Sequence, residues 1–136
     1  MKPPEEVKRD LVRQWLARAD EDLETAKFLF TSEKYFFAAI CFHCQQAAEK
    51  YFKAFLTWRQ IEFPKTHDLG LLLGLIASTA PSLAASLNEV AGLNPYGVDI
   101  RYPGDAPEIA REDAEEAIRL AKRVKEAISL ALEGNI

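Results

Sequence analysis

Apolar residues recur along this chain with the spacing of an α-helix, and no useful stretch alternates between apolar and polar residues as a strand does. The first pattern predicts a helix from Glu5 to Thr31. Its apolar positions fall within about 100° of one another on a helical wheel, which indicates one buried stripe. The stripe consists of Val12, Trp15, Leu16, Ala19, Leu23, Ala26 and Phe30. Asp22 lies at the edge of this stripe, where a partly buried carboxylate needs a polar partner.

A second helix is predicted from Tyr35 to Gln60, and its apolar arc is wider. The arc covers about 160° of the wheel, which is typical of a central helix covered on more than one side. Its members are Phe36, Phe37, Ile40, Cys41, Cys44, Ala47, Ala48, Tyr51, Phe52, Ala54, Phe55 and Trp58. Pro64 lies shortly after this helix and disfavours helical geometry in the residue before it.

Two further main helices and a shorter helical piece are predicted after Pro64, with a long irregular segment before the last helix. Thr66 is the expected N-cap of a helix that continues to Ala80, followed by a shorter helical piece from Pro81 to about Gly92. A last helix is expected from Glu108 to Glu133. Three prolines and two glycines exclude a continuous helix over residues 93–107, and such a segment is often functional. We expect it to pack over the bundle.

These elements predict an all-α fold: an antiparallel bundle of four main helices, with a short helix and a long loop before the last helix. At 136 residues, with 49% apolar and 28% charged residues, the chain fits one globular domain, residues 1–136. The net charge of −4 argues against a basic footprint for DNA over the whole domain. No apolar run approaches the roughly 20 residues of a membrane span, and the N-terminus lacks a signal-peptide core. We therefore expect a cytoplasmic protein that makes no membrane contact.

The two cysteines, Cys41 and Cys44, have the C-x-x-C spacing of a redox pair or of half a metal site. They lie in the apolar arc of the second helix, however, and the chain has no second C-x-x-C and only two histidines. We interpret them as small buried apolar side chains and predict neither a metal site nor a cofactor.

Opposite its apolar arc, the second helix carries a polar face of about 80°. The face consists of His43, Gln46, Lys50, Lys53 and Thr57, with Phe42 beside it. One imidazole, one amide and two ammonium groups suit an anionic ligand such as a nucleotide or an RNA backbone, with Phe42 available for stacking. The alternative is an ordinary solvated face on which Glu49 pairs with Lys53 one turn away.

Four segments, in order along the chain, resemble motifs of the HEPN family, whose name stands for higher eukaryotes and prokaryotes nucleotide-binding. Residues 19–26 resemble its A-x-x-D-L-x-x-A opening, and residues 45–54 its central Q-Q-A-A-E-K-x-x-K-A motif. Residues 64–69 are similar to its P-x-T-H-D-L turn, and residues 93–103 to its L-N-x-Y…R-Y-P segment. The resemblance implies an antiparallel helical bundle that dimerises and works beside a small nucleotidyltransferase, often as a toxin–antitoxin pair.

Many members of the resembled family are ribonucleases that carry an Arg followed four to six residues later by a His, paired across the dimer. That motif is missing here, because no His follows Arg101 and because the spacing from Arg59 to His67 is too wide. We therefore assign no catalytic residue. His43 or His67 with Lys50 or Arg101 remains a possible divergent arrangement.

The resemblance leaves alternative roles open for several residues. His67 is either a structural residue that bonds Asp68 or the incoming loop, or a ligand contact. Asp22 is either the ion-pair partner of Lys50, Lys53 or Arg101, or a ligand-side group. Arg101 either binds phosphate beside Tyr102 or ties the long segment to Asp22 or Glu49. The expected ligand-binding residues are His43, Gln46, Lys50, Lys53, Arg101 and Tyr102, supported by Asp22, Glu49, His67 and Asp68.

Three hypotheses follow. The first is a HEPN-type module that binds nucleotide or RNA, forms a homodimer and partners a nucleotidyltransferase. The second is a metal-independent ribonuclease toxin with a divergent site. The third is a structural subunit whose polar face forms the two-fold interface, with Gln46 and Lys50 meeting their counterparts.

Overall fold

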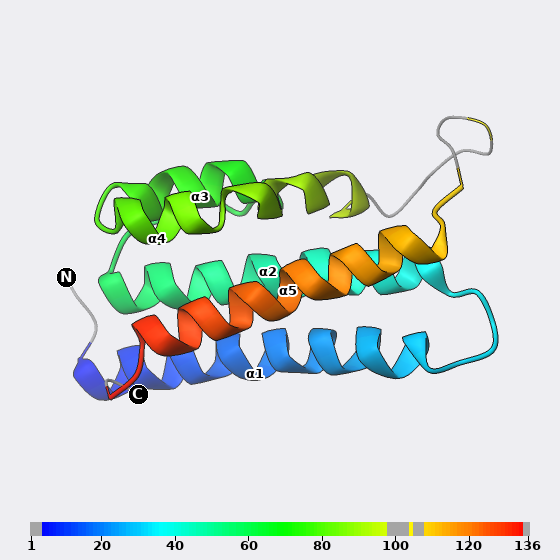
Figure 1. Cartoon of the computed structure of the whole chain (residues 1–136). Coiled ribbons are helices and arrows are strands. Elements are labelled where there is room, and N and C mark those ends of the chain that lie inside the picture. Colours follow the sequence, from blue (N-terminus) through cyan, green and yellow to red (C-terminus); the bar gives the residue numbers. More distant parts are fainter. Residues whose placement is uncertain (1–3, 98–103, 105–107, 135–136) are drawn as a thin grey trace.

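The computed structural model describes residues 4–97, 104 and 108–134, and the elements it contains are helices (Figure 1). They are α1 (Glu5–Phe30), α2 (Phe37–Arg59), α3 (Leu69–Ala77), α4 (Pro81–Ser86), the 3₁₀ helix η1 (Asn88–Gly97) and α5 (Arg111–Ala131). The predicted all-α bundle is therefore confirmed. Helices α1 and α2 run antiparallel, α5 crosses over them, and α3, α4 and η1 form a layer along α2 (Figure 1).

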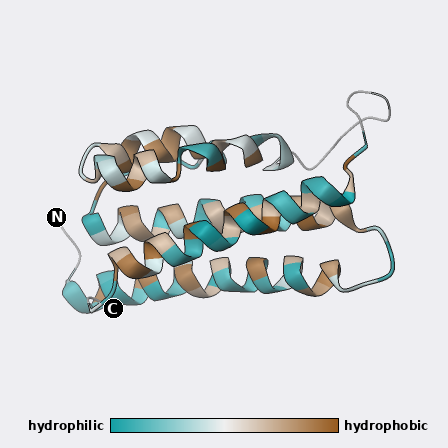
Figure 2. Cartoon of the chain, viewed as in Figure 1, coloured by the Kyte–Doolittle hydropathy of each residue, from teal (hydrophilic) through white to brown (hydrophobic). Residues whose placement is uncertain are grey.

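Helix α2 is the centre of the core, as its wide apolar arc predicts. Thirteen of its residues from Ile40 to Leu56 are buried, and the predicted stripe of α1 packs against them. Figure 2 shows hydrophobic and hydrophilic residues in alternating bands along α1 and α5, whereas α3 is largely hydrophobic. Both cysteines are 0% exposed within this core, as predicted. Burial, reinforced by the nearby Cys41 and Asp22, raises the pKa of the Cys44 thiol.

Helix α2 ends through its own backbone rather than directly at the proline. Gln60 adopts the left-handed conformation with φ 57°, and the amide of Ile61 donates to the carbonyl of Leu56 at 2.9 Å. This pattern of hydrogen bonds is a Schellman-type helix end. Pro64 then lies within the connecting segment that leads to α3.

The prediction that Thr66 caps the third helix is wrong. Asp68 is the N-cap, and its carboxylate accepts hydrogen bonds from the amides of Gly70 and Leu71. Thr66 lies two residues earlier, where its hydroxyl oxygen accepts from the amide of Asp68 at 3.1 Å. A carboxylate binds two helix-end amides better than a hydroxyl does, which explains the shift of the boundary. The helix also ends at Ala77, three residues before the predicted end at Ala80.

The irregular segment begins later than predicted. Pro95 would interrupt an α-helix, but the more tightly wound 3₁₀ helix η1 includes it and continues to Gly97. Leu93 is buried within η1, so the start of the segment does pack on the bundle, while residues 98–103 lie outside the described residues. The last helix begins at Arg111 rather than Glu108. Its start is fixed by Asp113, whose carboxylate accepts from the amide of Ala110 at 2.8 Å.

None of the helices among the described residues combines the length and the apolar character needed to cross a membrane.

Candidate functional site on the α1–α2–α3 face

One carboxylate of α1 organises the first half of the polar face of α2. Asp22 accepts from Nζ of Lys50 through one oxygen, while its other oxygen lies 2.8 Å from Nδ1 of His43. The Asp22 side chain is only 13% exposed, and those of Lys50 and His43 are 23% and 29% exposed. Asp22 therefore has the polar partner that its place on the α1 stripe requires. Of the three partners considered from the sequence, Lys50 is observed, and His43 is a partner that the sequence did not predict.

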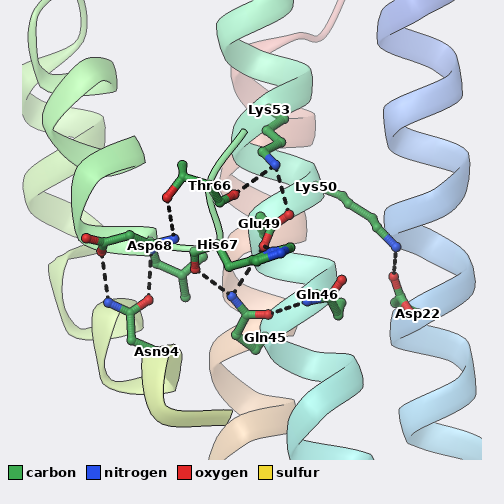
Figure 3. A network of polar contacts seen from close by, with 11 residues as sticks. Asp22, Gln45, Gln46, Glu49, Lys50, Lys53, Thr66, His67, Asp68 and Asn94 are labelled. Carbon is green, nitrogen blue, oxygen red and sulfur yellow. Dashed lines mark hydrogen bonds and ion pairs between the residues drawn. The ribbon is translucent and has the colours of Figure 1, made fainter. Parts of the chain in front are cut away.

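A second carboxylate, Glu49, organises a deeper cluster (Figure 3). Its side chain is 4% exposed and lies 2.9 Å from Nζ of Lys53 and 2.7 Å from Nδ1 of His67. Lys53 is itself buried and also donates to the carbonyl of Thr66 at 3.0 Å. The pairing of Glu49 with Lys53 predicted for a solvated face is present, but it is a buried pair, which costs desolvation and depends on its extra hydrogen bonds.

Gln45, a residue not singled out from the sequence, joins this cluster to the segment before α3. Its Nε2 donates to the carbonyl of His67 at 2.9 Å, and its Oε1 accepts from Gln46 at 2.7 Å (Figure 3). The Gln45 side chain is fully buried, so these bonds satisfy a polar group that would otherwise be costly to bury. Its spacing of one helical turn from Glu49 is the signal in the sequence that points to it.

Asp68 at the start of α3 and Asn94 in η1 form a further group of hydrogen bonds beside this cluster. The Nδ2 atom of Asn94 donates to Asp68 at 3.0 Å, and its Oδ1 accepts from the amide of Leu69 at 2.8 Å. The hydrogen bond from Asn94, with those from the amides of Leu71 and Gly70, holds the pKa of Asp68 below its ordinary value. Asp68 therefore has a structural role that links α3 to η1, as Figure 3 shows.

The structure divides the expected ligand-binding residues into three groups. His43, Gln46 and Lys50 are partly exposed at the surface between α1 and α2. Lys53 is buried, so it does not belong to an exposed stripe as the wheel predicted, because the connecting segment covers this part of α2. Arg101 and Tyr102 lie outside the described residues.

The two histidines share one arrangement. In both, Nδ1 contacts a carboxylate, which leaves Nε2 as the ring nitrogen for another partner. The His67 side chain is 70% exposed, so its ring lies at the surface although its partner Glu49 is buried. Each lysine of the face is also matched by a carboxylate, so the surface is less cationic than its sequence suggests. It offers hydrogen-bond donors more than net positive charge.

Within the described residues, no group of three or more His, Cys, Asp or Glu side chains has the arrangement of a metal site.

Comparison with known proteins places this chain in a family. The chain matches the model of the HEPN domain over residues 12–131. It is 30% identical over 128 residues to "Putative toxin MJ1304" of Methanocaldococcus jannaschii, and the match covers 84% of this chain and 83% of that protein.

Two crystal structures have the same fold. ST0689, described as an archaeal HEPN homologue, superimposes with a TM-score of 0.71 and is 26% identical, covering 90% of this chain and 98% of its own. TT1696 from Thermus thermophilus gives a TM-score of 0.70 at 29% identity, covering 88% of this chain and 96% of its own. Because the family match spans most of the chain, the protein belongs to the HEPN domain family.

Proposed function

We propose that this HEPN protein, acting as one domain over residues 1–136, binds a nucleotide or RNA on the surface formed by His43, Gln46 and Lys50. In this proposal it is a cytoplasmic homodimer and the partner of a small nucleotidyltransferase in a toxin–antitoxin-like pair. The relative named as a toxin and the membership in the HEPN family support a toxin-like module.

The observation that carries the binding proposal is the set of donors at the α1–α2 surface. Lys50 and His43 both contact Asp22, which fixes their side chains, and both remain partly exposed. Gln46 lies between them on the same face of α2 and is partly exposed. Donors fixed in this way suit a phosphate or base edge, because less side-chain entropy is lost on binding. Phe42 contacts His43 edge-on, with ring centroids 5.6 Å apart, and adds an aromatic surface.

The test measures binding of a labelled ten-nucleotide RNA by fluorescence anisotropy, and of nucleotides by the rise in melting temperature that a ligand of the native state produces. Lys50→Gln and His43→Ala should each weaken binding about fivefold or more, because each removes a hydrogen bond to a charged group. Lys122→Gln is the matched control, because it removes one exposed lysine from α5. Absence of binding by RNA and by all four common nucleotides would overturn the proposal.

A metal-independent ribonuclease is the second candidate, and the contact between His43 and Asp22 favours it. A carboxylate on Nδ1 fixes the ring and leaves Nε2 to take the proton of an RNA 2′-hydroxyl, with Lys50 beside it for the phosphate. The 2′-oxygen bonds to phosphorus as the P–O5′ bond breaks, the departing 5′-oxygen takes a proton from water, and a 2′,3′-cyclic phosphate remains. Cleavage of RNA in EDTA that His43→Ala abolishes would establish this activity, whereas intact RNA in the presence of demonstrated binding would reject it.

The partnership is tested separately. Co-expression with a small nucleotidyltransferase encoded beside this chain should give a complex that survives gel filtration. Analytical ultracentrifugation at several protein concentrations tests whether the protein is a homodimer. A dimer that Lys50→Glu dissociates, in a protein that binds no nucleotide or RNA, would instead support a structural subunit with its polar face at the two-fold axis.

A further inference from the structure

A shallow hollow of about 210 Å³ lies on α1, and the proposed binding surface does not include it. It is lined by Leu11, Gln14, Trp15 and Arg18. These positions follow one face of the helix, and Asp22 continues the same face one turn after Arg18. The hollow therefore adjoins the surface on which Asp22 holds Lys50 and His43.

Trp15 anchors the hollow to the rest of the site. Its ring meets that of Phe63 edge-on, with centroids 6.3 Å apart, and Nζ of Lys53 lies 5.6 Å from its centroid. Phe63 belongs to the segment that covers Glu49, so the indole lies between α1 and that segment. The ring is half-buried, which fixes its position and leaves part of it on the hollow.

The polar groups at the rim are available for a ligand. The side chain of Arg18 is exposed and forms no ion pair or hydrogen bond with any other residue that the structure describes. Gln14 donates through Nε2 to Asp10 at 2.9 Å, which leaves its carbonyl oxygen as an acceptor. An aromatic floor, an acceptor and a guanidinium together match a base that stacks, donates an amino hydrogen and carries a phosphate.

We propose that this hollow binds one base of a single-stranded RNA, stacked on Trp15, with its phosphate on Arg18. This inference rests on the proposed function. The volume is below the roughly 300–1,000 Å³ of ordinary ligand pockets, so it suits one ring system rather than a whole dinucleotide. Trp15 lies seven residues from Asp22, about 10 Å along the helix. A short strand can therefore occupy the hollow and the His43–Lys50 surface together.

The fluorescence of the Trp15 indole shows whether a base occupies the hollow. The chain has two tryptophans, so Trp58→Phe leaves Trp15 as the only one. In this variant an unlabelled ten-residue oligoadenylate, whose base carries an amino group, should change the Trp15 emission over the same concentration range in which anisotropy reports binding. Arg18→Gln should weaken binding roughly tenfold at fixed salt. Arg13→Gln should have little effect, because Arg13 is an exposed arginine on another face of α1.

Each outcome decides a different question. Binding by anisotropy with an unchanged Trp15 spectrum, and with equal affinity for Arg18→Gln and Arg13→Gln, overturns this inference and leaves the proposed function standing. No RNA binding by either signal overturns this inference, and it overturns the proposed function as well if none of the four common nucleotides raises the melting temperature. A Trp15 spectrum that depends on protein concentration and not on RNA shows that a second copy covers Leu11 and the neighbouring Val7, which are 41% and 46% exposed, and also overturns the inference.

Discussion

The Nδ1 atom of His67 lies 2.7 Å from the Oε1 atom of Glu49, so an exposed ring of the connecting segment is bonded to a buried carboxylate of α2. The same carboxylate holds Lys53, and Lys53 holds the carbonyl of Thr66. Glu49 therefore fastens the segment before α3 to the central helix together with Gln45, which donates to the carbonyl of His67.

Glu49→Gln should destabilise the fold by about 3 kcal/mol, because it leaves the buried ammonium of Lys53 without a counter-charge. Urea unfolding followed by circular dichroism measures the change. Glu24→Gln is the matched control: it breaks the exposed pair with Lys27 and should cost less than about 1 kcal/mol. Equal costs for the two substitutions would contradict the buried role of Glu49.

Replacing Asp68 with Asn should reduce stability at neutral pH, and the deficit should disappear in acid. The hydrogen bond from Asn94 and those from the helix-end amides hold the folded pKa of Asp68 below its unfolded value of about 3.9. The charged form therefore contributes stability above pH 4, and this contribution is lost as the pH falls through the lower folded pKa. Urea midpoints of the two proteins should differ by a constant amount from pH 5 to 8 and converge below pH 4. A difference that persists at pH 2 would refute this assignment.

Gly97→Ala should destabilise the protein by about 1–2 kcal/mol through overpacking. A Cβ at this position would lie 3.0 Å from Cδ of Gln45, whose amide is held at both ends by hydrogen bonds and cannot easily yield. Gly92→Ala is the control in the same 3₁₀ helix, because a Cβ there meets nothing within 4 Å. Thermal unfolding of both variants gives the comparison, and a stable Gly97→Ala protein would show that Gln45 is not held in place.

Cys41 and Cys44 should react with a thiol reagent at pH 8 at least about a hundredfold more slowly in the folded protein than in 6 M guanidinium. Both side chains are fully buried, and burial raises the pKa of the Cys44 thiol, so little thiolate is present or accessible. The absorbance of the released chromophore follows the reaction. Rapid modification of the folded protein would indicate a reactive pair instead of two core side chains.

The sequence alone determined the apolar faces by which α1 and α2 enter the core, because an apolar stripe can leave water only by packing against another element. It also determined the HEPN family, since the order of four motifs is a property of the sequence and the family match confirms it. Helix ends were less certain. Several groups near each boundary compete for the same few backbone amides, and Asp68 competes with Thr66 in this way.

Only the tertiary structure decided which polar residues of α2 face water. The wheel placed Lys53 with Lys50, but the segment before α3 folds across α2 and covers Lys53, whereas Lys50 extends toward α1 (Figure 3). The path of that segment depends on tertiary contacts such as the hydrogen bond from Gln45 to the carbonyl of His67. The periodicity of apolar residues carries no information about such contacts. Asp22 of α1 reaches Lys50 only after the two helices have packed, whereas Glu49 and Lys53 are one turn apart on α2 and are buried together by the covering segment.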